Sequence, residues 1–141
     1  MKTDFLIIGS GIAGLSLALK LSKLGKVSII TKKHRAESNT NYAQGGIAAV
    51  MDSSDTFESH IADTLEAGAG LCKIESVRKI VTEGPEMIKE LIEIGARFSR
   101  EHGKLELGKE GGHSRNRIIH AKDLTGKEVE RALLHQIMLN K

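Results

Sequence analysis

A short glycine motif between two apolar segments constrains the fold of this chain more than any other feature. Residues 9–14 read Gly-Ser-Gly-Ile-Ala-Gly and follow directly on the apolar run at residues 5–8. That run has the length and composition of a buried strand, and leucines among small residues from 12 to 24 predict a helix after it. A second short strand is expected at residues 27–30, so the three segments fill one βαβ unit.

Each glycine of this motif has a physical role in nucleotide binding. Gly9 allows the tight turn, Gly11 lets a pyrophosphate approach the backbone, and Gly14 lets the helix and strand pack closely. The free N–H groups at the helix N-terminus then face the phosphates. Because the motif lies between a strand and a helix, it predicts a dinucleotide site. A P-loop is excluded, since Leu15 and Ser16 follow the motif in place of lysine and serine or threonine.

The end of the second expected strand lacks the acid that holds a ribose hydroxyl in simple NAD sites. The sequence there reads Ile-Thr-Lys-Lys at residues 30–33, and the first acid is Glu37. This leaves either an NADP-like site or a flavin family that uses other groups. Lys32 is then the candidate neighbour of the adenosine half, and a solvated lysine at a strand end is the alternative.

Four more helices are expected downstream. Apolar residues at four-residue spacing predict a helix over 55–68, with Asp55 as part of its cap signal. A short helix is expected near residues 77–81. Pro85 is expected to begin a separate helix that Gly95 closes.

The C-terminal third predicts a hairpin and a final helix. Residues 97–99 and 104–107 are expected to pair as a small hairpin. Thr125 and Glu128 match a capping box and predict that the last helix begins near Thr125. No repeat or linker is visible, so residues 1–141 are expected to form one domain.

Composition excludes several classes of protein. Of the 141 residues, 40% are apolar and 28% are charged, with a net charge of +3, which is ordinary globular usage rather than that of a disordered tail or a membrane bundle. The apolar segment at residues 5–19 is too short and too interrupted by glycine to span a bilayer. Cys72 is the only cysteine, so no internal disulfide forms, and we expect a cytoplasmic protein.

Two further kinds of binding are not expected. Acidic residues interleave the basic ones and aromatic residues make up 3%, so nucleic-acid binding is unsupported. The six histidines show no metal-ligand spacing and have one cysteine to help them, so no metal site is expected.

A second polar loop carries short hydrogen-bonding side chains. Residues 38–49 read Ser-Asn-Thr-Asn-Tyr-Ala-Gln-Gly-Gly-Ile-Ala-Ala, and the glycine pair has no Cβ to block a flat ring. Such a loop can surround a polar heterocycle, or it can be an ordinary surface loop. Composition does not decide between them.

Together with residues 9–14, this loop resembles the Y-A-Q-G-G-I-A-A segment of the fumarate reductase and succinate dehydrogenase flavoprotein family. Residues 110–129, which read EGGHSRNRIIHAKDLTGKEV, look like a block of one branch of that family, the L-aspartate oxidases. The resemblance extends over essentially the whole chain in three ordered blocks. It implies an α/β fold: the N-terminal portion of a Rossmann-like FAD-binding domain, spanning residues 1–141. The sheet is then incomplete, the capping and C-terminal helical domains are absent, and the chain is expected to be a truncated or split part of a longer protein.

The resemblance also implies an activity. The branch oxidises L-aspartate to iminoaspartate in de novo NAD biosynthesis, with FAD as cofactor, oxygen or fumarate as electron acceptor, and quinolinate synthase as pathway neighbour. Two alternatives stay open. One is a segment of a fumarate reductase or succinate dehydrogenase flavoprotein, and the other is a non-catalytic nucleotide-binding remnant.

Carried over motif by motif, the resemblance implies that FAD lies against the two loops, with Lys32 on the adenosine side. The implied cofactor-binding residues are Gly9, Ser10, Gly11, Ile12, Ala13, Gly14, Lys32, Asn39, Thr40, Asn41, Tyr42, Ala43, Gln44, Gly45 and Gly46. Asn39 occupies the position of the histidine that bonds covalently to flavin in succinate dehydrogenases. An asparagine amide cannot form that bond, so non-covalent FAD is expected.

The same resemblance assigns substrate orientation to Glu110. The dehydrogenase branch usually has an apolar residue at this position, and aspartate differs from succinate by an α-ammonium group that a carboxylate recognises. Without the surrounding block, Glu110 reads as an exposed loop acid. His113 and His120 lie in the block with either packing or catalytic roles, and the catalytic arginine is expected outside this chain.

Overall fold

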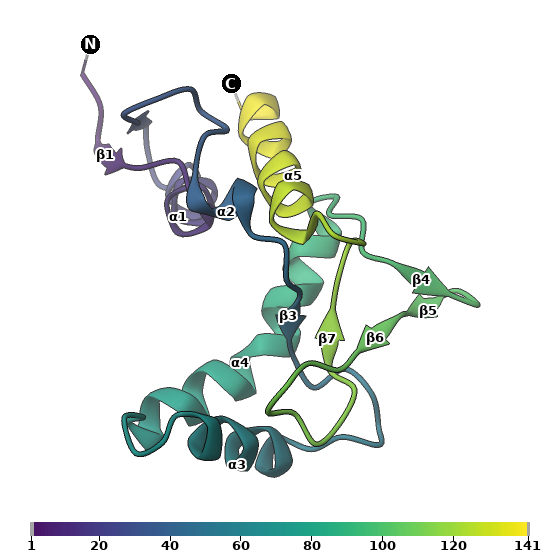
Figure 1. Ribbon diagram of the computed structural model, residues 1–141. Coiled ribbons are helices and arrows are strands. Elements are labelled where there is room, and N and C mark those ends of the chain that lie inside the picture. The colour runs from purple at the N-terminus through teal and green to yellow at the C-terminus, as the bar shows by residue number, and fades with distance from the viewer. Residues whose placement is uncertain (1, 141) are drawn as a thin grey trace.

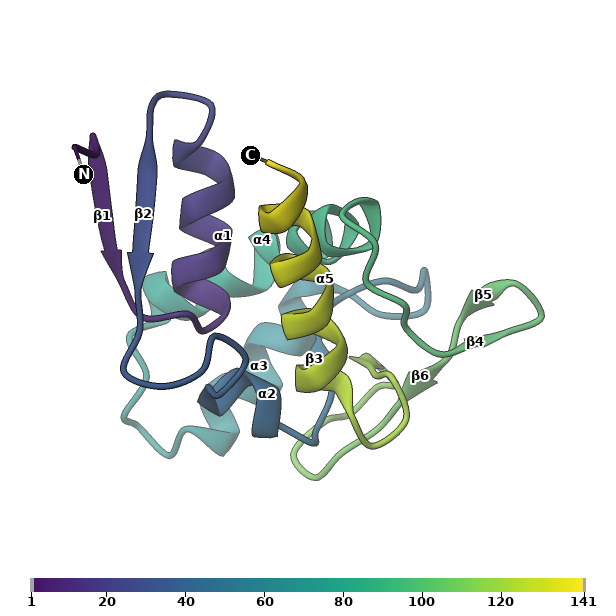
Figure 2. The same ribbon diagram turned by 90° about the horizontal axis from the view of Figure 1, so that it is seen from above.

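The fold begins with a parallel pair of strands joined by a crossover helix (Figure 2). The computed structural model describes residues 2–140. Strand β1 (Phe5–Ile8) pairs with β2 (Val27–Ile30), and α1 (Ile12–Leu21) connects them. The expected βαβ unit is therefore confirmed. The helix ends earlier than expected, because the N–H of Ser22 makes its last helical bond and residues 22–25 turn back toward β2.

The loop after β2 contains a short helix that the sequence did not predict. In α2 (Asn39–Tyr42), the Ser38 hydroxyl caps the helix by accepting a hydrogen bond from the Asn41 N–H at 3.2 Å. The chain then enters a small antiparallel sheet in the order β3-β7-β6. Its strands are β3 (Ile47–Ala48), β6 (Leu107–Gly108) and β7 (Ile118–Ile119). The described residues thus form several small sheets and no large one.

Helix α4 (Ile74–Glu93) is continuous, and the expected break before Pro85 is wrong. Proline removes one backbone hydrogen bond from a helix interior and usually kinks it. Here the buried residues Val77, Val81, Ile88 and Leu91 keep helical spacing on both sides of the proline. Packing therefore holds the helix together, and Figure 1 shows α4 changing direction along its length.

Two helix caps also differ from the sequence interpretation. Helix α3 (Phe57–Ala67) is capped by the Thr56 hydroxyl, which accepts from the Ser59 N–H at 3.1 Å, and not by Asp55. Helix α5 (Thr125–Leu139) begins where expected but has no capping box, because Leu124 is its cap residue. The Thr125 hydroxyl instead accepts a hydrogen bond from the Ala121 N–H.

The expected hairpin is present with a shifted first strand. Strand β4 (Arg100–Glu101) pairs with β5 (Lys104–Leu105), and residues 102 and 103 turn in the left-handed region with φ of 50° and 81°. Phe98, in the expected strand at 97–99, is buried in the core instead.

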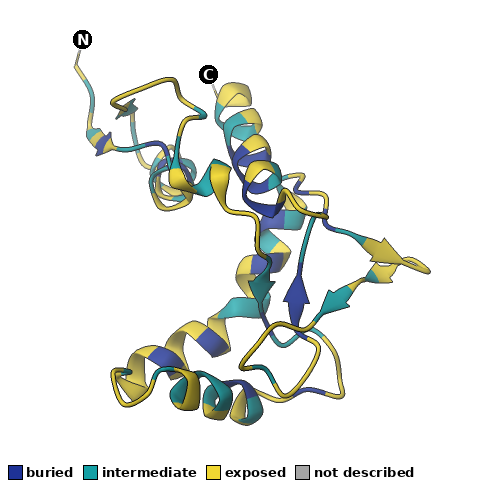
Figure 3. Ribbon diagram, viewed as in Figure 1, coloured by how far each residue is buried: buried dark blue, intermediate teal, exposed yellow. Residues whose placement is uncertain are grey.

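Helix α5 contacts both α1 and α4, and in Figure 2 it lies beside α1 and in front of α4. Its buried face packs in one apolar core with residues of α1, α4 and β7, as the dark positions of Figure 3 show. Central core residues are Leu15, Ile88, Ile119, Val129 and Leu133. Within residues 2–140, every helix is too short or too polar to cross a lipid bilayer.

Candidate functional site

The glycine motif folds as a strand-to-helix turn of the kind that receives a phosphate. Gly9 has φ of 107°, a left-handed conformation that favours glycine, and its N–H donates to the Ile30 carbonyl at 2.8 Å. A Cβ at Gly14 would collide with the Gly9 carbonyl, so the first turn of α1 is closely packed against the end of β1. The tight turn expected at Gly9 and the close packing expected at Gly14 therefore have a direct geometric basis.

The N-terminus of α1 keeps its positive electrostatic end. No acidic residue lies in the first turn, and Gly11 caps the helix without a side-chain hydrogen bond. Ser10 is buried, and its hydroxyl donates to the Thr31 hydroxyl at 3.1 Å, which ties the turn to the end of β2. These features fit the pyrophosphate of a dinucleotide, whose charge complements the helix end.

The structure brings the second polar loop onto this turn. The N–H of Ile12 donates to the Thr40 hydroxyl at 3.0 Å, and a Cβ at Gly11 would lie 3.4 Å from the same oxygen. Two segments that the sequence separates by 28 positions therefore meet at the α1 N-terminus. We call residues 39–46, which the sequence resemblance predicts to contact the flavin, the flavin loop.

Helix α5 supports the flavin loop from the other side. The N–H of Gly126 donates to the Ala43 carbonyl at 3.0 Å. A Cβ at Gly126 would overlap the Thr40 carbonyl oxygen and lie 2.7 Å from the Ala43 carbonyl oxygen. The loop backbone thus occupies the space that a side chain would take, and sequence reasoning did not identify Gly126 as part of this site.

The remaining candidate cofactor-binding residues differ in how far they are exposed to solvent. Asn39, Tyr42 and residues 43–45 are exposed, so the polar side of the flavin loop is open to a ligand. Gly46 is half-buried at the start of β3, where a Cβ would overlap the Ile118 side chain. Lys32 lies two residues after the end of β2 and is exposed, as a group facing the adenosine half would be, and it makes no ion pair within residues 2–140.

Glu110 lies next to the flavin loop. Its side chain is exposed, and its Oε1 atom would be 3.7 Å from a Cβ at Gly45. These two positions are 65 residues apart in the sequence, so the fold brings the candidate substrate residue and the candidate flavin residues to one place. His120 is not part of this contact, because its Nε2 atom faces Glu106 at 3.9 Å.

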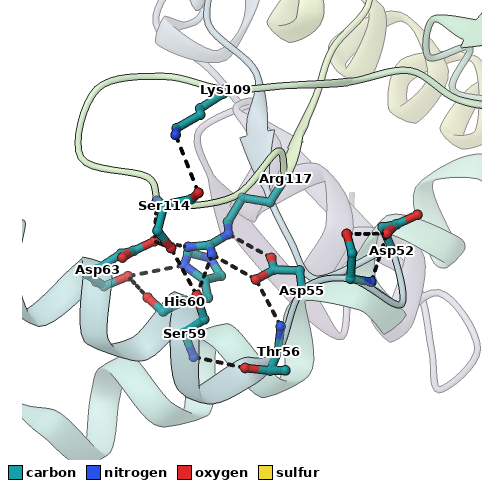
Figure 4. Close-up of polar contacts among 11 residues, drawn as sticks. Asp52, Asp55, Thr56, Ser59, His60, Asp63, Lys109, Ser114 and Arg117 are labelled. Atoms are coloured by element: carbon teal, nitrogen blue, oxygen red, sulfur yellow. Dashed lines mark hydrogen bonds and ion pairs between the residues drawn. The ribbon is translucent and has the colours of Figure 1, made fainter.

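A buried arginine lies beneath the segment that carries Glu110 (Figure 4). The Arg117 side chain is fully buried, and its Nε and Nη2 atoms donate to the two carboxylate oxygens of Asp55 at 2.8 Å each. Nη1 donates to Asp63 at 2.7 Å, and Nη2 also reaches the Ser59 hydroxyl at 3.1 Å. We call Arg117, Asp55 and Asp63 the arginine clamp.

The contacts around the clamp lower the pKa of Asp63 and of the neighbouring His60. The hydrogen bond from the Ser114 backbone N–H, with further bonds from the Ser114 hydroxyl and Arg117, lowers the pKa of Asp63 below its usual value despite some burial. Burial, together with the positive charge of Arg117, lowers the pKa of His60. The His60 and His113 rings meet edge to face with centroids 5.9 Å apart. The lowered pKa favours the neutral form of His60 beside the charged Arg117.

Comparison with known proteins places the chain among flavoproteins. The family model of an FAD-binding domain matches residues 4–140. A chloroplastic L-aspartate oxidase of Oryza sativa is 59% identical over 95% of this chain, and an L-aspartate oxidase of Vibrio cholerae is 49% identical over 94%. The chain covers 21% and 26% of those two proteins, so it spans about a fifth to a quarter of their length.

Solved structures agree with this fold. A fumarate reductase of E. coli matches 99% of the chain with a TM-score of 0.93 and 31% identity. A structure of Sdh1 from Mycobacterium smegmatis, in complex with UQ1, matches 96% of the chain with a TM-score of 0.88 and 33% identity. The chain covers 24% and 23% of those two structures.

Proposed function

Because the chain belongs to the family of FAD-binding domains, we propose that it forms the nucleotide-binding segment of an enzyme that oxidises L-aspartate to iminoaspartate. The observation that carries this proposal is the position of Glu110 beside the flavin loop. A carboxylate at that place recognises an α-ammonium group, which aspartate has and succinate lacks. The similarity to L-aspartate oxidases over nearly the whole chain supports the same conclusion.

The residues of this chain bind and orient in the proposed reaction. When bound, FAD supplies the two-electron oxidising chemistry. The positive end of α1 would hold the pyrophosphate, together with those backbone N–H groups of residues 9–14 that are not already bonded to Ile30 or Thr40, and Lys32 would face the adenosine. The flavin loop, from Asn39 to Gly46, lies along the ribityl and the flavin. Since Asn39 cannot form a covalent bond to flavin, the cofactor is held by non-covalent contacts.

Glu110 orients the substrate and does not exchange a proton with it. Its negative charge would hold the ammonium group of aspartate beside the flavin loop. The charge-assisted contact also discriminates against a dicarboxylate without an ammonium group, because the unpaired carboxylate then faces a substrate of its own sign. The arginine that serves as the catalytic base lies in our proposal outside residues 1–141.

The proposal includes the electron acceptor and the cellular setting. Oxygen or fumarate reoxidises the reduced cofactor, and quinolinate synthase is the neighbour that consumes the product. A reducing compartment such as the cytoplasm fits the single cysteine, Cys72.

The second candidate is a fumarate reductase or succinate dehydrogenase segment, which the similarity to those solved structures favours. The two candidates differ in the substrate that the carboxylate of Glu110 selects. An enzyme built for succinate has no use for this charge, so the substrate preference of the complete enzyme separates them.

The test replaces Glu110 by glutamine in a complete enzyme, made by exchanging this chain for the matching segment of the Vibrio cholerae relative. Glu110→Gln keeps the size and removes the charge, so kcat/KM for aspartate falls by roughly 10- to 150-fold, corresponding to about 1.5–3 kcal/mol. Fumarate reduction does not fall, and it rises to the extent that the removed charge repelled the dicarboxylate. The matched control is Glu101→Gln, an exposed acid at the tip of the β4–β5 hairpin.

Two results would contradict the proposal. If both activities fall by the same factor, Glu110 is a structural loop residue. If the unmodified enzyme oxidises succinate and not aspartate, the second candidate is correct.

A further inference from the structure

The segment that carries Glu110 has a single strong anchor in the fold. We call residues 109–116 the Glu110 loop. The Arg117 N–H donates to the Gly108 carbonyl at 3.0 Å and closes the base of the loop, and the Ala49 N–H donates to the Arg117 carbonyl at 3.0 Å. Residues 109–112 are exposed, so apolar burial does not hold this part of the loop in place.

The anchor is Ser114, which is bound to the arginine clamp (Figure 4). Asp63 Oδ2 accepts hydrogen bonds from the Ser114 N–H at 2.7 Å and from the Ser114 hydroxyl at 2.8 Å. The same oxygen accepts from Arg117 Nη1. Within the loop, the His113 N–H donates to the Glu110 carbonyl at 3.2 Å. A short chain of polar contacts therefore runs from the buried arginine to Glu110.

We propose that Asp63 and Arg117 are positioning residues that fix the Glu110 loop against the flavin loop and so set the preference for an amino-acid substrate over a dicarboxylate without an amino group. Neither residue touches the substrate. The inference rests on the proposed role of Glu110. It adds that this role depends on a clamp built from Asp55 before α3, Asp63 within α3 and Arg117 at the base of the loop.

The geometry explains why Asp63 is the position to test. Arg117 is fully buried, and its removal would leave Asp55 as an unpaired buried charge, which threatens the fold itself. Removal of Asp63 leaves the two-bond pair between Arg117 and Asp55 intact. It removes the contact to Arg117 Nη1 and two of the contacts that hold Ser114, whose hydroxyl keeps only its contact with the Ser59 hydroxyl at 3.0 Å. A loop that then moves by about 1 Å loses much of its alignment with a bound substrate.

The experiment is a double-mutant cycle in the same complete enzyme. Asp63→Ala lowers kcat/KM for aspartate by about tenfold and changes fumarate reduction by less than about threefold. In the Glu110→Gln background, Asp63→Ala has little further effect, because the two residues act through one interaction. Ser114→Ala keeps the backbone N–H contact and gives a smaller loss. The control is Glu66→Ala, an exposed acid one turn further along α3.

Loop mobility gives a second readout that does not depend on activity. Lys109 and Arg115 are exposed in the Glu110 loop and are trypsin sites. Asp63→Ala raises the rate of cleavage there by about tenfold, since opening of the loop no longer breaks the clamp contacts, whereas Glu66→Ala leaves it unchanged. In the activity measurements, aspartate oxidation and fumarate reduction are determined on one preparation of each variant. A partly unfolded sample then lowers both activities equally and does not alter their ratio.

Three outcomes would overturn the inference. If Asp63→Ala lowers kcat/KM for aspartate by the same factor in the unmodified enzyme and in the Glu110→Gln variant, Asp63 acts independently of Glu110. This conclusion holds even where Glu110→Gln alone changes the ratio of aspartate oxidation to fumarate reduction. Unchanged cleavage at Lys109 and Arg115 would show that the clamp does not hold the loop. If Glu110→Gln alone leaves the aspartate-to-fumarate ratio unaltered, the proposed role of Glu110 fails and the positioning role fails with it.

Discussion

Gly126 is the position where one added methyl group tests how the flavin loop is supported. It is the second residue of α5, and its N–H binds the Ala43 carbonyl. In Gly126→Ala, the new Cβ would overlap the Thr40 carbonyl oxygen and lie 2.7 Å and 2.8 Å from the oxygen and Cβ of Ala43. Backbone atoms cannot rotate out of the way, so α2 or α5 must move.

Three effects determine how Gly126→Ala changes the free energy of unfolding: two lower it and one raises it. Overpacking of a close contact costs about 1–3 kcal/mol. A stretched or lost hydrogen bond to Ala43 adds about 0.5–1.5 kcal/mol. The higher helix propensity of alanine returns at most about 1 kcal/mol. The free energy of unfolding therefore falls by about 2 kcal/mol, which is roughly 8 °C in Tm for a chain of this size.

Thermal unfolding and FAD titration of the two glycine variants check this reasoning. The matched control is Gly84→Ala inside α4, where the new Cβ would make an ordinary contact of 3.6 Å with the Ala49 Cβ. There the helix propensity gain acts alone, and Tm rises. Gly126→Ala also weakens FAD binding, because Thr40 moves away from the Ile12 N–H. A Tm for Gly126→Ala at or above that of the unmodified protein would refute the argument.

Three further results are expected. Acid precipitation of the complete enzyme releases all FAD into the supernatant, because Asn39 cannot bond to flavin; a yellow pellet would show a covalent link. Glu130→Gln raises the free energy of unfolding by about 1–3 kcal/mol at pH 8 in urea titrations, because both oxygens of the buried Glu130 lack a hydrogen bond within residues 2–140. Burial raises the pKa of that carboxyl, so the gain shrinks as pH falls toward 4.5, and an equal gain at all pH values contradicts it. In the Glu130→Gln variant, which lacks the opposite effect of that carboxyl, urea titrations also show lower stability in acid. The lowered pKa of His60 removes stability as pH falls below 6.5, and the lowered pKa of Asp63 removes more below pH 3.8, so a flat profile of this variant from pH 7 to 3 would exclude both effects.

The sequence predicted those parts of the fold that local patterns determine. The βαβ unit at residues 5–30 combines an apolar run, a glycine turn and periodic leucines within one short segment, and each signal agrees with the others. The break expected at Pro85 failed because the buried face of α4 packs in the core on both sides of the proline. Helix α2 was missed, since four polar residues carry no periodic signal.

The clamp could not be predicted from local patterns. Asp55 stands directly before a helix, where a short acid usually caps the first turn, and the sequence interpretation gave it that role. Its actual partner, Arg117, is 62 residues away and belongs to a stretch of alternating charges that reads as a solvated face. A contact of this kind depends on how α3 and β7 come together, and the sequence of either segment alone is silent about it.

Close backbone packing explains why so much of this site is encoded by glycine. Three segments converge on the flavin loop, and at each contact a Cβ would meet the neighbouring segment: Gly11 against the Thr40 hydroxyl, Gly126 against the α2 backbone, and Gly46 against β7. The exposed side chains of the loop, such as Tyr42, meet no such limit. Substitutions that keep these glycines therefore change the contacts to a ligand one at a time, whereas a methyl group at Gly46 or Gly126 displaces the whole loop. For this reason the spacing of the glycines carries more information about the site than the polar residues between them.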